Sequence, residues 1–134
     1  MLLEGDCEEK MRQFNRRVHA RKALIVQAQR LMLPFLKDVL ERAGIDDVVA
    51  YRCASASTLR RSRADVVLLD VDARGTQPLG LIRETRLQTS ARIVVMTRND
   101  DRAWEAMALA LGADAILGPQ ANRQDLFTAF AVAN

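Results

Sequence analysis

An uninterrupted apolar run, Val66–Leu69, ends directly in Asp70, and this feature restricts the folds open to the chain most strongly. A matching run, Ala23–Val26, precedes Gln27 and Ala28. Runs without polar alternation suit strands that are buried on both faces of a sheet, and functional groups collect at the carboxyl ends of such strands. We therefore expect a parallel sheet with Asp70 at its functional edge.

Five segments have the pattern of buried strands, and helical patterns separate them. Alternation of strands and helices predicts a parallel sheet covered by helices. The predicted strands are Lys22 to Val26, Asp47 to Arg52, Asp65 to Asp70, Ala91 to Thr97 and Ala115 to Leu117.

The helical patterns have recognisable starts and ends. The first begins near Pro34 and ends at Gly44, with a stripe formed by Phe35, Leu36, Val39, Leu40 and Ala43. A second, from Asp101 to Leu111, places Ala103, Met107, Ala110 and Leu111 on one side and stops at Gly112. Asp125 to Ala133 supplies a final helix, and Ala54 to Ala64 one abbreviated helix or a loop.

The composition excludes several classes of protein. A net charge of +3 in 134 residues is too small to indicate nucleic-acid binding. Cys7 and Cys53 lack metal-ligand spacing, and we expect reduced thiols in a cytoplasmic protein. No apolar run reaches the ~18 residues of a membrane span, and the acidic start of the chain does not resemble a signal peptide. We therefore expect no membrane association.

Residues 1–21 form an extension ahead of the domain, which we assign to residues 22–134. Cys7, Met11, Phe14 and Val18 fall at helical spacing, so an added amphipathic helix is predicted. Its other face is basic, through Lys10, Arg12, Arg16, Arg17, Arg21 and Lys22. We interpret this face as solvated or as a protein contact, because no aromatic interleaving supports nucleic-acid recognition. His19 has no partners at ligand spacing and is interpreted as a surface residue.

The order of three landmarks resembles the receiver domain of bacterial response regulators over roughly residues 22 to 133. Asp65 to Asp70 is similar to the third strand with its phospho-acceptor aspartate. Ile93 to Thr97 is similar to the fourth strand with its switch hydroxyl, and Gly112 to Asp114 to the turn before the fifth strand. The resemblance implies a flavodoxin-like, doubly wound α/β fold with five parallel strands in the order 2-1-3-4-5.

The same resemblance implies a phosphoryl-transfer site from which parts are missing. The acidic pair that holds Mg²⁺ in the family is replaced by Gln27 and Ala28, Pro119 stands at the lysine position, and Ile116 replaces the switch aromatic residue. Carboxylates and water are what Mg²⁺ prefers, and phosphoryl transfer depends on positioning and charge neutralisation. We therefore expect no cofactor, with Mg²⁺ bound only if Asp70 is functional.

Asp70 is accordingly open to two interpretations. It is either a phospho-acceptor or an inherited carboxylate at the sheet edge, and we favour the second. Thr97 is the switch candidate, with that role only if Asp70 is modified, and Asp72 is interpreted as a loop acid. Arg98 and Arg74, which replaces the proline of the family's loop, flank the same edge and are possible anion contacts.

Apolar residues near the end of the chain point to a second functional surface. Trp104 lies off the stripe predicted for its helix, at helical spacing from Ala108. The final helix has two apolar pairs at the same spacing, Leu126 with Phe130 and Phe127 with Ala131. The face made by helix four, strand five and helix five is the usual output and dimerisation surface of receivers. We therefore predict an interaction surface at Trp104, Ala108, Phe127 and Phe130, with local packing of Trp104 as the alternative.

These observations predict a stand-alone pseudo-receiver, a binding module and not an enzyme, since no output domain follows residue 134. It would act through protein contacts, with a histidine kinase or another signalling protein, or as a homodimer through the output face or the amino-terminal helix. One alternative is a response regulator phosphorylated at Asp70. A second is a cyclic dinucleotide effector, for which the weak indications are Arg60, Arg61 and Arg63 and the arginine spacing in Arg17–Arg21.

Overall fold

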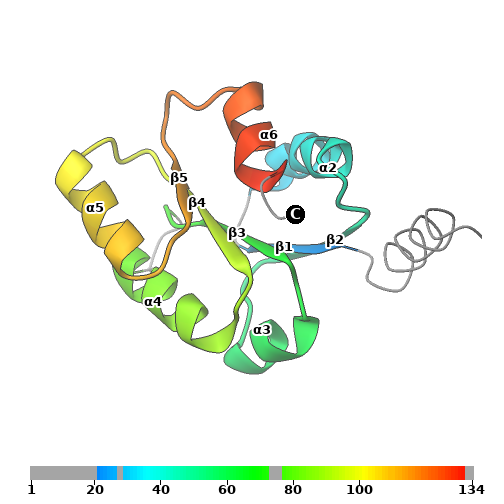
Figure 1. The fold of residues 1–134 in the computed structure, drawn as a ribbon, viewed down its shortest axis with the longest axis horizontal. Helices are drawn as coiled ribbons and strands as arrows, with labels where there is room; N and C mark the ends of the chain where they lie inside the picture. Colours follow the sequence, from blue (N-terminus) through cyan, green and yellow to red (C-terminus); the bar gives the residue numbers. More distant parts are fainter. Residues whose placement is uncertain (1–20, 27–28, 73–76, 132–134) are drawn as a thin grey trace, which may run out of the picture.

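Five parallel strands form one sheet in the computed structural model, which describes residues 21–26, 29–72 and 77–131 (Figure 1). Their order in the sheet is β2-β1-β3-β4-β5. The strands are β1 (Lys22–Val26), β2 (Asp47–Tyr51), β3 (Val66–Asp70), β4 (Arg92–Met96) and β5 (Ala115–Leu117). The predicted flavodoxin-like order is confirmed, and each observed strand end lies within one residue of its prediction. The extension at residues 1–20, with its predicted helix, Cys7 and His19, lies outside the described residues.

Helices cover both faces of the sheet, as the doubly wound fold requires (Figure 1). A 3₁₀ turn η1 (Arg30–Met32) leads into α2 (Leu33–Arg42), which packs beside α6 (Arg123–Ala131) on one face. The other face carries α3 (Ala56–Ser62), α4 (Pro78–Gln88) and α5 (Arg102–Ala110). No bounds were predicted for α4.

The strands divide the apolar side chains between two cores because successive residues point to opposite faces. Ala23 and Ile25 of β1 pack beneath α2 and α6, whereas Leu24 and Val26 pack beneath the other three helices. All four are essentially inaccessible to solvent. The unbroken apolar runs in the sequence are thus explained by burial on both sides of the sheet.

The helix ends follow local sequence rules. Pro34 occupies the second position of α2, and Gly44 follows the helix with a φ of +90°, a left-handed conformation that glycine adopts without strain. The hydroxyl oxygen of Ser55 accepts a hydrogen bond from the N–H of Thr58 at 3.1 Å and caps α3. The abbreviated helix predicted after the second strand is confirmed.

The prediction that the second strand is buried is wrong. Asp47, Ala50 and Tyr51 are exposed, and Val48 and Val49 are only half-buried. The strand lies at the edge of the sheet and pairs only with β1, so neighbouring structure covers it incompletely.

The predicted buried side of α5 is also wrong, except at Leu111, which is partly buried against the core. Met107 is 48% exposed, and Ala103 and Ala110 are exposed as well. The buried side instead carries Ala108, with Trp104 partly buried against the same core. Small alanines lie on both sides of this helix, so its periodicity is ambiguous, and the bulk of the indole ring favours burial of the Trp104 side.

The final helix begins two residues earlier than predicted, at Arg123. Leu126, Ala129 and Phe130 face the core shared with α2, whereas Phe127 is 36% exposed. The predicted end at Ala133 lies outside the described residues.

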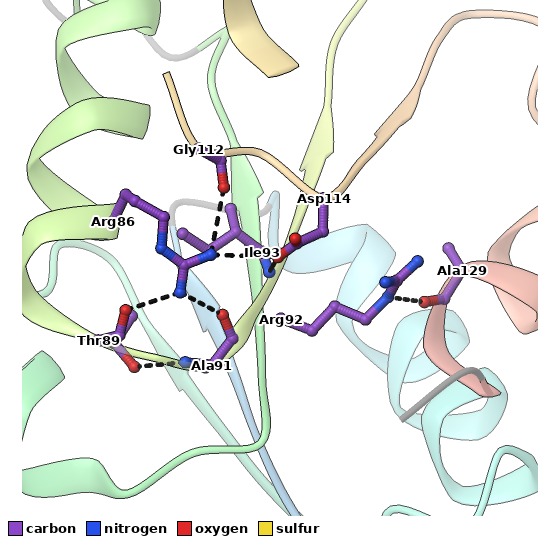
Figure 2. Close-up of polar contacts among 8 residues, drawn as sticks. All are labelled: Arg86, Thr89, Ala91, Arg92, Ile93, Gly112, Asp114 and Ala129. Carbon is purple, nitrogen blue, oxygen red and sulfur yellow. Dashed lines mark hydrogen bonds and ion pairs between the residues drawn. The ribbon is translucent and has the colours of Figure 1, made fainter. Parts of the chain in front are cut away.

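An arginine network ties together the loops at the amino-terminal edge of β4 (Figure 2). The Arg86 guanidinium donates to the carbonyl oxygens of Thr89 and Ala91 at 2.7 Å each. It also donates at 3.2 Å to the carbonyl oxygen of Gly112 and to the carboxylate of Asp114. One side chain of α4 thereby satisfies carbonyl groups from two loops that would otherwise need water.

Two further contacts in Figure 2 extend this network to the sheet and to α6. The Asp114 carboxylate accepts from the N–H of Ile93 at 2.8 Å, and the Arg92 side chain donates to the carbonyl oxygen of Ala129 at 2.8 Å. The amino-terminal edge of the sheet is therefore fixed by polar contacts, and the opposite edge carries the candidate site.

Within the described residues, no helix has both the length and the apolar character needed to cross a lipid bilayer.

Candidate functional site

A cleft of about 440 Å³ opens at the carboxyl ends of β3, β4 and β5. Asp70, Thr97 and Gly118 mark these three strand ends. Polar residues of the wall include Asp72, Arg98, Asn122 and Arg123, and the apolar residues are Met32, Phe35, Met96, Leu117, Ala121 and Leu126. The structure therefore brings the predicted acceptor and switch candidates together in one cavity.

Asp70 is half-buried at the end of β3, and its carboxylate Oδ1 accepts a hydrogen bond from the N–H of Asp72 at 3.2 Å. Burial raises the pKa of the Asp70 carboxyl above its ordinary value of 3.8, and the negative charge of Asp72 raises it further. The same N–H contact and the positive charge of Arg98 act in the opposite direction, but they do not outweigh burial.

Asp72 is the residue whose role the sequence analysis missed. Its carboxylate Oδ1 accepts from the Thr97 hydroxyl at 3.0 Å, and its Oδ2 accepts from the N–H of Arg98 at 2.7 Å. Asp72 is an exposed loop acid, as interpreted, and its carboxylate also links the turn after β3 to the loop after β4. Its spacing of two residues from Asp70, beside the end of the neighbouring strand, was the available indication.

Thr97 is buried, with 6% of its surface exposed, and its backbone N–H donates to the carbonyl oxygen of Leu117 at 3.0 Å. Its hydroxyl oxygen accepts from the N–H of Asn99 at 3.0 Å while the hydroxyl donates to Asp72. The hydroxyl thus has two partners and is held at the edge of the cleft.

Two arginine side chains contribute positive charge to the described cleft wall. Arg98 is exposed at the end of β4 and acts on Asp70 through its charge. Arg123 forms an ion pair with Asp38 of α2 and lies over the ring of Phe35, 5.5 Å from its centroid. No lysine is among the described wall residues, and Pro119 occupies the wall at the position where the resemblance would place one.

The carboxylates of the described cleft wall are Asp70 and Asp72. The described residues contain no group of three or more acidic, histidine or cysteine side chains placed to hold a metal. Each oxygen of Asp72 already accepts one hydrogen bond, from Thr97 or from Arg98, and Asp70 accepts one from a backbone N–H. Mg²⁺ is usually held by one or two carboxylates together with several waters. That the ion binds here only if Asp70 is functional stays a prediction.

Three of the predicted site positions, Gln27, Ala28 and Arg74, lie outside the described residues. Ile116 is described, and it is half-buried in β5 against the core beneath α5. The consequence predicted for it, loss of the aromatic ring that reports a switch, stays a prediction.

The predicted interaction surface needs correction. Ala108 and Phe130 have no exposed surface, and Trp104 is partly buried against the core, as the alternative of local packing proposed. Phe127 is the exposed member of the set. The apolar surface of α5 instead comes from Met107 and Leu109, which are 48% and 44% exposed.

The arginine cluster predicted as a nucleotide contact lies away from the cleft. Arg60 and Arg61 belong to the last turn of α3, and Arg63 follows it, near the start of β3, whereas Asp70 lies at the end of that strand. All three are exposed, and Arg60 donates to the side chain of Gln88 at 3.1 Å. The geometry therefore gives no support to a nucleotide site formed by these arginines together with the cleft.

Comparison with known proteins finds curated relatives of low sequence identity. No protein-family model matches the chain. The transcriptional regulatory protein CpxR of Klebsiella pneumoniae is 27% identical over 105 residues, which is 78% of this chain and 45% of the relative. The sensory transduction protein RegX3 of Mycolicibacterium smegmatis is 29% identical over 92 residues, or 68% of this chain and 40% of the relative. The chain thus spans less than half the length of these two relatives.

Solved structures of response regulators have a similar fold. A two-component response regulator from Clostridium difficile superposes with a TM-score of 0.71 at 25% identity, covering 84% of this chain and 94% of that one. A response regulator from Thermotoga maritima superposes with a TM-score of 0.69 at 21% identity, covering 84% and 98%.

Proposed function

We propose that this chain, a CheY-like receiver domain of the response-regulator family, works as a pseudo-receiver that signals through protein contacts without phosphorylation of Asp70. The similarity to a two-component response regulator of known structure supports a role in two-component signalling. We further propose that it binds a histidine kinase or another signalling protein and functions in the cytoplasm.

The make-up of the cleft wall carries the proposal. Asp70 meets no lysine among the described wall residues, and its neighbour Asp72 is engaged by two other donors. The two residues that follow β1 are Gln27 and Ala28, which supply no carboxylate. Because phosphoryl transfer is catalysed mainly by positioning and charge neutralisation, a lone carboxylate is a poor acceptor.

The surface for a protein contact lies between α5 and α6. A groove there is lined by residues of both helices and of β5, among them Arg102, Glu105, Ile116 and Asp125. Met107 and Leu109 on α5 and Phe127 on α6 add exposed apolar surface to these helices. A partner with apolar side chains and a mixed-charge rim would suit it, as protein interfaces generally do. A second copy of this chain is the alternative occupant.

Phosphorylation at Asp70 is the second candidate function, and one observation favours it. Arg98 lies at the cleft and its charge lowers the pKa of Asp70, so a cation is close to the carboxylate. A guanidinium suits bidentate contacts with a phosphoryl group.

The test is to treat the purified protein with beryllofluoride and Mg²⁺, and separately with a small-molecule phosphodonor, using Asp70→Asn as the control. Amide chemical shifts and intact mass report the outcome. The proposal predicts no Asp70-dependent shift and no added phosphoryl mass. A saturable response that Asp70→Asn abolishes would instead establish the phosphorylated regulator.

A further inference from the structure

Two carboxylates lie at the carboxyl end of β3, and their environments differ. Asp70 accepts one backbone N–H and faces the cleft, whereas each oxygen of Asp72 accepts from a donor at the end of β4. The Thr97 hydroxyl and the Arg98 N–H converge on a single carboxylate. A hydroxyl and an adjacent backbone amide that converge in this way form a site for one oxyanion, and Asp72 fills it.

Asp72 is an exposed residue whose carboxylate accepts one hydrogen bond on each oxygen. The 2.7 Å contact with the Arg98 N–H falls at the short end of the range for bonds to an ionised acceptor. Thr97 is 6% exposed, so its hydroxyl has little access to water as an alternative partner. The carboxylate is also tethered beside these donors, which gives it a large advantage over a free anion in solution.

A chain of hydrogen bonds continues from this carboxylate to α5. The Thr97 hydroxyl oxygen accepts from the Asn99 N–H, and the Asn99 side-chain oxygen accepts from the Asp101 N–H at 2.9 Å. The Asp101 carboxylate then accepts from the Ala103 N–H at 2.9 Å in the first turn of α5. The Asp72–Thr97 bond joins two segments, and the other bonds follow the loop after β4 to the start of α5.

We propose that Asp72 is an internal anion that closes the oxyanion site of Thr97 and Arg98 and thereby fixes the loop leading to α5. The site accepts an external oxyanion of the phosphate class only when the Asp72 carboxylate is removed or displaced. Asp72 is therefore the residue through which a change in the cleft reaches α5. This inference goes beyond the proposed function and holds whether or not Asp70 is phosphorylated.

The test uses ¹H–¹⁵N spectra of the full chain and inorganic phosphate as the probe. Asp72→Ala removes both acceptors, and Asp72→Asn keeps one oxygen that can accept from only one of the two donors. Asp100→Ala is the matched control, because Asp100 is an exposed acid of the same loop whose carboxylate accepts no hydrogen bond from the described residues. Unchanged amide shifts of the β4 core show that each variant is folded.

In Asp72→Ala we expect the Arg98 amide proton to move upfield, with smaller changes at Asn99, Asp101 and Ala103. Phosphate should then give saturable shifts at Thr97 and Arg98 that are absent from the unmodified protein and from Asp100→Ala. Asp72→Asn should give an intermediate change at Arg98.

Two results would overturn the inference. One is an Arg98 amide that does not respond to either Asp72 substitution in a folded protein. The other is equal phosphate binding, including none, by the unmodified chain and Asp72→Ala. Neither result bears on the proposed function, which fails separately if Asp70 of the unmodified chain acquires a phosphoryl group.

Discussion

Replacement of Arg86 by methionine is expected to destabilise the fold far more than the same change at another arginine of α4. The methionine keeps an apolar side chain against the loop but removes the guanidinium, which donates to three carbonyl groups and to Asp114. Figure 2 shows these acceptors converging on the one side chain from two loops.

The magnitude follows from the individual contacts. A carbonyl group that loses a charged donor costs about 1 kcal/mol when water can partly replace that donor, so three carbonyl groups give about 3 kcal/mol. The ion pair with Asp114 adds little, because the Asp114 side chain is 39% exposed and such pairs contribute about 0.5 kcal/mol. A loss of about 3 kcal/mol corresponds to a fall in Tm of roughly 10 °C for a domain of this size.

The assay is urea and thermal unfolding, followed by circular dichroism and by the fluorescence of the partly buried Trp104. Arg83→Met is the matched control, because Arg83 is exposed on the same helix and forms no hydrogen bond or ion pair with the described residues. Arg86→Lys should recover part of the loss, since an ammonium group cannot reach all four acceptors at once. If Arg86→Met and Arg83→Met agree to within about 0.5 kcal/mol, the network does not hold the loops together.

Three further predictions concern glycines, the cleft carboxylate and the corrected helix faces. Gly112→Ala should lower the free energy of unfolding by at least about 2 kcal/mol, because the position has a φ of +125° and a Cβ there would overlap the Arg86 side chain. Gly80→Ala should instead raise it by about 0.5–1 kcal/mol by stabilising α4. Chemical denaturation measures both changes. Asp70→Asn should raise Tm at pH 7, and this gain should disappear below pH 3.8. Burial raises the folded-state pKa of Asp70, so the protonated carboxyl contributes fully to stability below the unfolded-state pKa. That contribution is lost as pH rises through the folded-state pKa. A Tm difference that does not change with pH would refute this account. Phe130→Ala should cost about 3–5 kcal/mol and Phe127→Ala less than about 1 kcal/mol in urea titrations, and similar losses would contradict the assignment of their faces.

The sequence predicts the sheet well because the strands are buried on both faces. Each apolar run becomes a strand, and even the three-residue β5 is found where the pattern indicates it. The edge strand β2 has the same type of residues but lacks neighbours on one side, and position in the sheet is not encoded in a local run.

The helix faces and polar contacts are less accessible to sequence reasoning. On α5 the apolar residues surround most of the helix, so periodicity alone does not separate Met107 from Ala108. Arg86 contacts loops that lie up to 28 residues away, and nothing in its local sequence distinguishes it from Arg83. The position of Asp72 is the part that the strand ends indicate. Asp70 pairs with Met96 in the sheet, so Asp72, two residues after Asp70, lies beside Arg98, two residues after Met96.

The same geometry explains why a hydroxyl can be retained at the end of β4 in a cleft that lacks the other parts of a phosphoryl-transfer site. A hydroxyl that is 6% exposed needs a partner, because leaving it unpaired costs about 1–3 kcal/mol. Asp72 supplies that partner from within the chain, so Thr97 serves the stability of the loop ahead of α5 without any modification of Asp70. The presence of a switch-type threonine in such a sequence is therefore not evidence of phosphorylation by itself. The residue that distinguishes a working switch from a fixed one in this cleft is the carboxylate at position 72.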